Sequence, residues 1–176
     1  SHQDGVIRIW ERGPADAWSI RRELAVDTQG MPMDVAVGES GFVAVISGTT
    51  RLYYWESFTA PEPEVHTLPE IYLDGPSKSL ALDPKCRWLA LAMQGTQRIL
   101  IWDLQEKRLQ SEIRDPITTG TVAMEFSPAG DYFAWGMTGL LQVLRTDGFT
   151  LLFEHKGNIS WHGFHFSFKL AIEVFK

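Results

Sequence analysis

The stretch RILIWDL, residues Arg98–Leu104, decides the fold, because its apolar run ending in a tryptophan recurs along the chain. Similar runs are VIRIWE at Val6–Glu11, RLYYWES at Arg51–Ser57 and LLQVLRT at Leu140–Thr146, where Leu144 replaces the tryptophan. The anchor positions 10, 55, 102 and 144 are separated by 45, 47 and 42 residues. This regular spacing indicates an internal structural repeat.

Two further features recur in step with the anchor. A pair of strand-like runs joined by a turn precedes it: MDVAVGESGFVAVIS (33–47), KSLALDPKCRWLALA (78–92) and TVAMEFSPAGDYFAWG (121–136). A more polar run follows it: SIRREL (19–24), PEVHTLP (63–69), RLQSEI (108–113) and TLLFEH (150–155). Asp83-Pro84 and Ser127-Pro128 occupy the same turn position, where such residues supply the backbone angles of a tight turn. Each unit therefore holds four short strands.

The polarity of these strands predicts an all-β β-propeller of four-stranded antiparallel blades. The second and third strands are apolar at nearly every position, whereas a sheet with one solvated face would alternate. Continuous apolarity means that both faces are covered, as they are when blades stack around an axis. The fourth strand carries charged residues, which suits an outer edge. By the same reasoning we expect the anchors Trp10, Trp55 and Trp102 to lie in the core, and also Trp88 and Trp135 in second strands.

The strand count predicts about four blade equivalents in a single propeller region, 1–176. A half blade spans residues 1–25, complete blades span 31–69, 76–114 and 120–156, and a second half blade spans 159–174. We interpret this as a fragment of a larger propeller of the seven-bladed type. Two alternatives remain open: a closed four-bladed ring, and an open arc packed on another domain, which would leave an apolar blade face at each end.

At these positions the sequence resembles the WD-repeat family. A turn Asp4-Gly5 precedes the strand that ends at Trp10, Ile101-Trp102-Asp103 gives the Trp-Asp pair itself, and His155 falls where the family carries a histidine before a first strand. The resemblance implies structural repeat anchors at Asp4, Trp10, Trp55, Trp102, Asp103 and His155. The blades are divergent, since Thr49, Thr96 and Thr138 stand where the family's turn aspartate would be, so the family's hydrogen-bonded network is at best partial.

Composition excludes several functional classes. Of the 176 residues, 44% are apolar and 22% charged, which is typical of a globular domain and excludes a disordered tail. The net charge of −6, with scattered Lys and Arg, argues against nucleic acid as a partner, and the short apolar runs argue against a membrane-spanning helix. Cys86 is the only cysteine, so no intrachain disulfide can form, and a reducing, cytoplasmic location is expected.

No residue pattern predicts catalysis, and we expect no metal or cofactor. His162 and His165 would point to opposite faces of a strand, which disfavours a shared metal. We expect His155 to be a structural residue that makes a hydrogen bond between strands. The run Gly38–Gly41 lacks the spacing of a nucleophile elbow. The competing hypothesis is a propeller enzyme (hydrolase, lyase or quinoprotein type) with its site at the central channel, where the first strands begin. The residues there, Asp34, Ser79 and Val122, do not compose an acid–base set.

The sequence therefore predicts a non-catalytic protein-interaction scaffold or sensor module within a larger protein or complex. Blades form a stiff framework, and loops on that framework contact other proteins or other domains of the same full-length chain. Candidate protein contacts are Trp18, Arg51, Glu62, Arg98 and Trp161. The proline-containing segment Ala60–Glu64 is a further stretch that a partner could bind.

Overall fold

A computed structural model describes residues 6–25, 33–46, 51–67, 79–92, 98–114, 123–137 and 139–157. These residues form fourteen β-strands and one short 3-10 turn, η1 (Pro14–Asp16). The strands are β1 (Val6–Arg12), β2 (Trp18–Ala25), β3 (Met33–Val37), β4 (Phe42–Ile46), β5 (Arg51–Trp55), β6 (Glu64–Thr67), β7 (Ser79–Leu82), β8 (Trp88–Ala92), β9 (Arg98–Asp103), β10 (Arg108–Arg114), β11 (Ala123–Phe126), β12 (Tyr132–Met137), β13 (Leu140–Arg145) and β14 (Thr150–Lys156).

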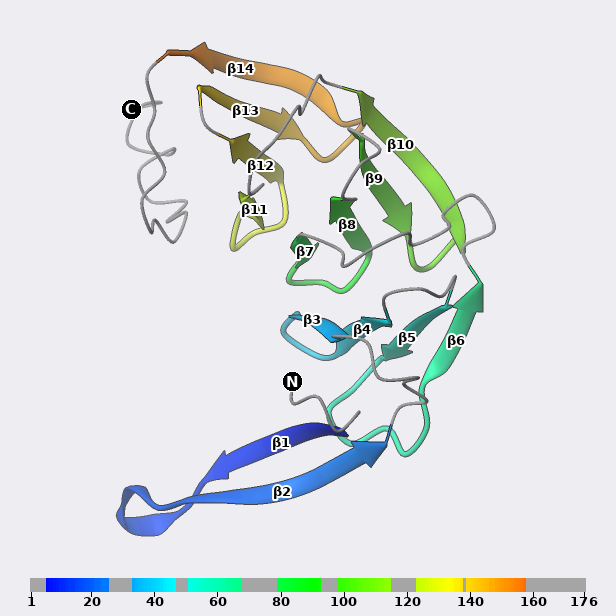
Figure 1. Cartoon of the computed structure of the whole chain (residues 1–176), viewed down its shortest axis with the longest axis vertical. Helices are drawn as coiled ribbons and strands as arrows, with labels where there is room; N and C mark the ends of the chain where they lie inside the picture. Colours follow the sequence, from blue (N-terminus) through cyan, green and yellow to red (C-terminus); the bar gives the residue numbers. More distant parts are fainter. Residues whose placement is uncertain are drawn as a thin grey trace.

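The strands form a partial β-propeller, which confirms the predicted fold class. Sheets β3–β6, β7–β10 and β11–β14 each hold four antiparallel strands in chain order, and β1 pairs with β2 in a two-stranded sheet. Figure 1 shows these sheets fanned along an arc, with β3, β7 and β11 on its inner side and β6, β10 and β14 on its outer side. Sheets β1–β2 and β11–β14 lie at opposite ends of this arc. The half blade expected at 159–174 lies outside the described residues.

The middle strands are covered on both faces. Every residue of β9 after Arg98 is buried, and so is every residue of β8 after Trp88. Strand β12 is buried from Phe133 to Gly136. For β8 and β9, this continuous apolarity is satisfied by a neighbouring sheet on each side, as their sequence predicts.

Alternate residues of a strand face alternate neighbours. Leu89 and Leu91 of β8 join a core with sheet β3–β6, whereas Ala90 and Ala92 join a core with sheet β11–β14. Within each of these interfaces the earlier sheet supplies mainly the smaller buried side chains and the later sheet the larger ones, although Tyr54 and Trp88 of the earlier sheets pack at the margins. In the second interface, for example, Ala81, Ala90 and Ala92 meet Phe126, Phe133 and Trp135.

The repeat anchors occupy equivalent register positions. Trp55 pairs with Phe42, Trp102 with Leu89, and Leu144 with Phe133, each on the second strand of its sheet. All three anchors belong to the core formed with the preceding sheet. Their side chains are 1%, 5% and 4% exposed, respectively. The apolar run therefore places its terminal anchor in the core between two sheets in each of these three repeats.

Trp10 departs from this rule and corrects the prediction that it is a core residue. Its side chain is 52% exposed. The anchor side chain faces the preceding sheet in every other repeat, and no described strand lies on that side of β1–β2. Trp88 is also less enclosed than expected: it is half-buried, with the Arg87 guanidinium 4.3 Å from its ring centroid.

A β-bulge marks the anchor in three of the sheets. The register shifts between Ile9 and Trp10, between Leu109 and Ser111, and between Val143 and Leu144. In each case the outer strand carries one extra residue beside the anchor, which increases the local twist.

The turns that join first and second strands are held by a side chain at one position. The Asp83 carboxylate accepts the backbone N–H groups of Lys85, Arg87 and Trp88, and the Ser127 hydroxyl accepts the N–H of Tyr132. Asp83 and Ser127 therefore play the same structural part in successive sheets, since each directly follows the first strand of its sheet. The corresponding turn of sheet β3–β6 is shorter and closes with a hydrogen bond from Gly38 N–H to Gly41 O of 2.9 Å.

Candidate functional site

The outward face of the β1–β2 hairpin carries three large exposed apolar side chains. Trp10, Trp18 and Ile20 are 52%, 63% and 44% exposed. Trp10 lies directly opposite Ile20, and Trp18 lies opposite Arg12, so these side chains share one face of the hairpin. An ion pair of 2.8 Å between Arg8 and Glu23 borders them on the same face.

The opposite face of the hairpin fixes it to the next sheet. Ile7 and Leu24 are buried against Phe42, Tyr53 and Trp55. Phe42 and Trp55 stack with ring centroids 4.7 Å apart, which makes this support rigid.

A side chain from β2 also holds the loop after β5. The Arg22 guanidinium donates to the carbonyl oxygens of Phe58 at 3.4 Å and Pro61 at 2.9 Å. The proline-containing segment is therefore attached to β2 through its backbone, while the side chain of Glu62 stays exposed. Because Arg22 pairs with Ile9, this loop is attached to the hairpin on the face opposite to Trp10 and Ile20.

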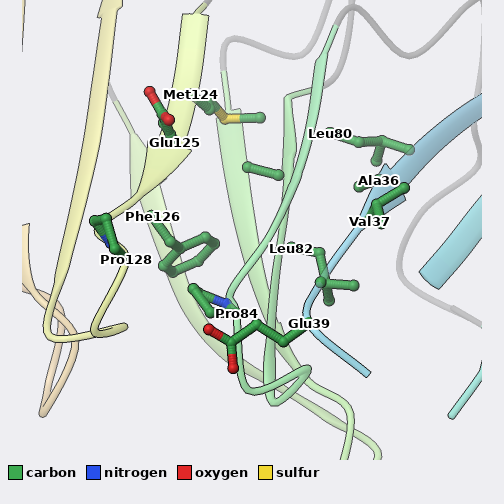
Figure 2. A pocket seen from close by; sticks show the side chains of 12 residues that line it. Ala36, Val37, Glu39, Leu80, Leu82, Pro84, Met124, Glu125, Phe126 and Pro128 are labelled. Atoms are coloured by element: carbon green, nitrogen blue, oxygen red, sulfur yellow. The ribbon is translucent and has the colours of Figure 1, made fainter. Parts of the chain in front are cut away.

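The inner strands β3, β7 and β11 line a hollow of about 440 Å³. Its wall is mainly apolar and includes Val37, Leu80, Leu82, Met124 and Phe126. Figure 2 shows the carboxylates of Glu39 and Glu125 at opposite ends of the hollow, with Phe126 between them. Such a wall favours an apolar or amphipathic group. Within the described ranges, no three His, Cys, Asp or Glu side chains are grouped so that they could hold a metal ion.

A buried histidine, His66, lies on the outer strand β6, near the turn after β9. Burial lowers the pKa of His66, and its Nε2 lies 3.6 Å from Glu64 Oε2. The hydrogen bond that Lys107 donates to Glu64 lowers the pKa of that carboxyl group. The ring of His66 also faces Tyr54, with centroids 6.4 Å apart, and burial raises the pKa of that phenol. Lys107 therefore links the turn of one sheet to the outer strand of the preceding one.

The Trp-Asp pair has a local structural role. Asp103 is fully buried, and its Oδ1 accepts the backbone N–H groups of Gln105 and Glu106 at 2.9 and 3.0 Å. Its Oδ2 accepts a hydrogen bond of 3.2 Å from Arg87. The indole N–H groups of Trp55 and Trp102 are buried without a hydrogen-bond partner among the described residues. The positions 49, 96 and 138, where the sequence leaves the family pattern, lie outside the described ranges.

The other predicted contact residues do not form one site. Arg51 is exposed at the start of β5, Glu62 is exposed in the loop after it, and Arg98 on β9 pairs with Glu112 at 3.2 Å. Of these, Glu62 alone lies near the hairpin that carries Trp18. Asp4 and Trp161 lie outside the described residues.

His155 corrects the expectation of a hydrogen bond between strands. Its side chain is exposed and makes no hydrogen bond with any residue that the structure describes. It lies on β14, the outermost strand of its sheet, where a side chain has a sheet neighbour on one side only. Ile20, in contrast, was not identified from the sequence. The sequence feature that could have indicated an exposed Ile20 is its position in an alternating outer strand near two tryptophans.

Comparisons with known proteins place the fold but not the function. No family model matches the sequence, and no curated protein matches it. Among solved structures, the chain is similar to KlHsv2 with loop 6CD replaced by a Gly-Ser linker (TM-score 0.64, 16% identity, 89% of this chain and 50% of that one). It is also similar to Kuenenia stuttgartiensis hydrazine synthase (TM-score 0.56, 13% identity, 78% of this chain and 39% of that one). Both are β-propeller proteins, and the chain spans half or less of the length of each.

Proposed function

We propose that this chain is a non-catalytic protein-interaction module of the WD-repeat type, working as a scaffold or sensor within a larger protein or complex. The observation that carries the proposal is the exposed group of Trp10, Trp18 and Ile20 on a rigidly supported hairpin. Tryptophan supplies much of the binding energy at protein interfaces, and large exposed apolar groups mark such interfaces.

The packing inside the arc indicates what such a partner looks like. The anchor side of every later sheet is covered by a sheet face of smaller side chains, such as Ala36 and Val43 against Leu89 and Leu91. The anchor side of β1–β2 has the same large side chains. The expected partner is therefore a β-sheet face of small apolar residues, contributed by another protein or by another domain of the full-length protein.

The WD-repeat assignment is supported by local structure. Trp102 and Asp103 end the third strand of a four-stranded sheet, and Asp83 and Ser127 hold equivalent turns. A cytoplasmic location and proteins as the partners, instead of nucleic acids or membranes, are parts of the same proposal. Within the described ranges no helix is long and apolar enough to cross a bilayer.

The test is affinity capture with the full chain, followed by quantification of the retained proteins. Trp18→Ala is expected to reduce a specifically retained protein about tenfold or more, since interface tryptophans often contribute 2 kcal/mol or more. Val65→Ala, which changes an equally exposed apolar side chain on β6, is the matched control and should leave retention unchanged. Equal retention by wild type and Trp18→Ala would contradict the proposal, as would the absence of any protein retained above background.

A further inference from the structure

A polar groove of about 550 Å³ lies between sheets β7–β10 and β11–β14, on the side where first strands turn into second strands. It is separate from the apolar hollow and from the β1–β2 face. One wall comes from the β7–β8 and β9–β10 turns and from β10; the other comes from the β11–β12 and β13–β14 turns. The lining residues are Asp83, Lys85, Arg87, Trp88, Gln105, Arg108, Gln110, Gly130, Asp131, Thr146, Asp147 and Gly148.

The wall formed by sheet β7–β10 carries the positive charges, together with the Asp83 carboxylate, which is buried, accepts three backbone N–H groups and attracts Lys85. Lys85 and Arg108 are exposed, and neither makes an ion pair with any residue that the structure describes. Arg87 is committed elsewhere, because its guanidinium packs over the Trp88 ring and pairs with Asp103. Lys85 and Arg108 are thus the cations of this wall without an ion-pair partner among the described residues, while the Arg87 side chain is paired but also 46% exposed.

The wall formed by sheet β11–β14 carries the negative charges. Asp131 and Asp147 are exposed, and their carboxylates make no ion pair within the described part of the chain. Their backbone is fixed: Thr146 N–H donates to Asp131 O at 3.0 Å, and the Thr146 hydroxyl donates to Gly130 O at 2.6 Å. Neither carboxylate pairs with Lys85 or Arg108, so the exposed charged side chains are positive on one wall and negative on the other.

The floor of the groove keeps the walls at a fixed separation. The Trp88 ring meets Phe149 edge to face, with centroids 5.3 Å apart, so the two sheets are packed together beneath the charged residues. Gly130 also lies close to the Asp83 carboxylate, since a β-carbon on this glycine would be 3.5 Å from Asp83 Oδ2. The charge separation is therefore part of the folded structure.

We propose that this groove binds an extended peptide segment in which acidic and basic residues alternate. Successive side chains of an extended chain point to opposite sides. A segment along the groove presents residues i and i+2 to one wall and i+1 and i+3 to the other. Acidic side chains then meet Lys85 and Arg108, while basic ones meet Asp131 and Asp147. A ligand of one sign would be attracted by one wall and repelled by the other.

This inference rests on the proposed role as a protein-interaction module, but it is tested without a cellular partner. The probe is a fluorescein-labelled hexapeptide, Glu-Lys-Glu-Lys-Glu-Lys, titrated with the full chain by fluorescence polarisation at low ionic strength. The control peptides are Glu-Glu-Glu-Lys-Lys-Lys, which has the same composition and net charge, and hexaglutamate. We expect the alternating peptide to bind about fivefold or more tightly than either control.

Two charge variants distinguish recognition of the alternating charge pattern from general electrostatic attraction between peptide and protein. The double change Lys85→Glu and Arg108→Glu should weaken binding of the alternating peptide about tenfold, because two favourable pairs become repulsive. Adding Asp131→Lys and Asp147→Lys exchanges the signs of the two walls. Binding should then return to within about threefold of wild type, since an alternating peptide fits the exchanged groove after a shift of one residue. Arg114→Glu, at the other end of β10, should change nothing.

Equal binding of the three peptides by wild type, or no binding at all, would overturn the inference regardless of how any variant folds. A fourfold variant that melts like wild type but does not recover binding would overturn it too. If Trp18→Ala still reduces partner capture while the alternating peptide fails to bind, only the proposal for the groove is refuted. If peptide binding holds while Trp18→Ala has no effect on capture, the β1–β2 interface is lost instead.

Discussion

Gly38 and Cys86 meet at the contact between two successive turns, so closely that a β-carbon on Gly38 would overlap the Cys86 sulfur. Beside this contact, Glu39 N–H donates to Pro84 O at 2.9 Å. The first turn of sheet β3–β6 is thereby joined to the first turn of sheet β7–β10 by both packing and a backbone hydrogen bond. Cys86 itself is buried and adopts a positive φ of 56°.

Gly38→Ala should therefore destabilise the fold by about 1–3 kcal/mol, the usual cost of overpacking. Cys86→Ala in the same chain should recover part of that loss, because it removes the overlapping sulfur, although Asp83 O remains 3.0 Å from the new β-carbon. Urea denaturation of both single variants and the double variant measures the coupling. Gly148→Ala, whose β-carbon would meet Thr150 Cγ2 at an ordinary 3.8 Å, is the control. Strict additivity of the two changes would refute the contact.

Trp102→Ala and Trp10→Ala should have very different effects, although both residues occupy the anchor position. Trp102 is 5% exposed in the core between two sheets, and its truncation should cost about 3–5 kcal/mol. Trp10 is half-exposed, and its truncation should cost about 1 kcal/mol or less. The free energies of unfolding from denaturant titrations decide this. Similar losses for the two variants would mean that the Trp10 face is covered in the free protein.

Asp103→Ala should lower the melting temperature more than Asp103→Asn. The alanine leaves two turn N–H groups, those of Gln105 and Glu106, without their acceptor, at a cost of about 1–3 kcal/mol. The asparagine keeps an oxygen for them and loses only the charged pair with Arg87, whose side chain is 46% exposed, so that the pair contributes little. Calorimetry of the wild type and the two variants measures the decrease in melting temperature caused by each substitution. Equal damage by the two substitutions would show that the carboxylate charge, not the turn, is what matters.

His66 should make stability depend on pH. Burial lowers its pKa in the folded protein, so the folded state binds the proton less readily than the unfolded state does. The contribution of His66 to stability is then complete above the unfolded value of about 6.5 and declines as the pH falls from there through the folded pKa. Glu64 attracts the protonated ring, while Lys107 opposes protonation.

Melting temperatures between pH 7.5 and pH 5 test this. His66→Gln should reduce the loss of stability on acidification, because the neutral side chain cannot bind the proton. His155→Gln, which changes an exposed histidine on the rim, should leave the pH profile as it is. A His66→Gln profile parallel to that of wild type would exclude His66 as the source of the pH dependence.

The arrangement of strands in each sheet could be predicted because the same pattern of apolar and polar runs recurs several times in the sequence. Continuous apolarity at RILIW and WLALA requires two covered faces, and the structure provides them. The fate of Trp10 could not be predicted in this way. A repeat pattern shows which face of a strand is apolar and suited to pack against another sheet, but it does not show whether such a sheet is present.

The candidate surfaces were less accessible to sequence reasoning. The charges of the groove come from Lys85, Arg108, Asp131 and Asp147, which lie in four separate segments and meet only after two sheets have packed. His66 illustrates the same difficulty. Its sequence surroundings, PEVHTLP, are typical of a polar outer strand, whereas in the structure His66 is buried beside Tyr54 and Glu64.

The difference in side-chain size across each interface has a consequence for how such a protein can grow. In the two interfaces between four-stranded sheets, the earlier sheet contributes mainly small core residues and the later sheet larger ones, so a tandem duplication of a gene segment would keep this general pairing of small with large side chains. Transposing two units is harder, since Ala90 and Ala92 are matched to the aromatic rings of Phe133 and Trp135 in particular. The linear order of the units is thus recorded in the volumes of the side chains between them, and a shuffled gene would encode mismatched neighbours.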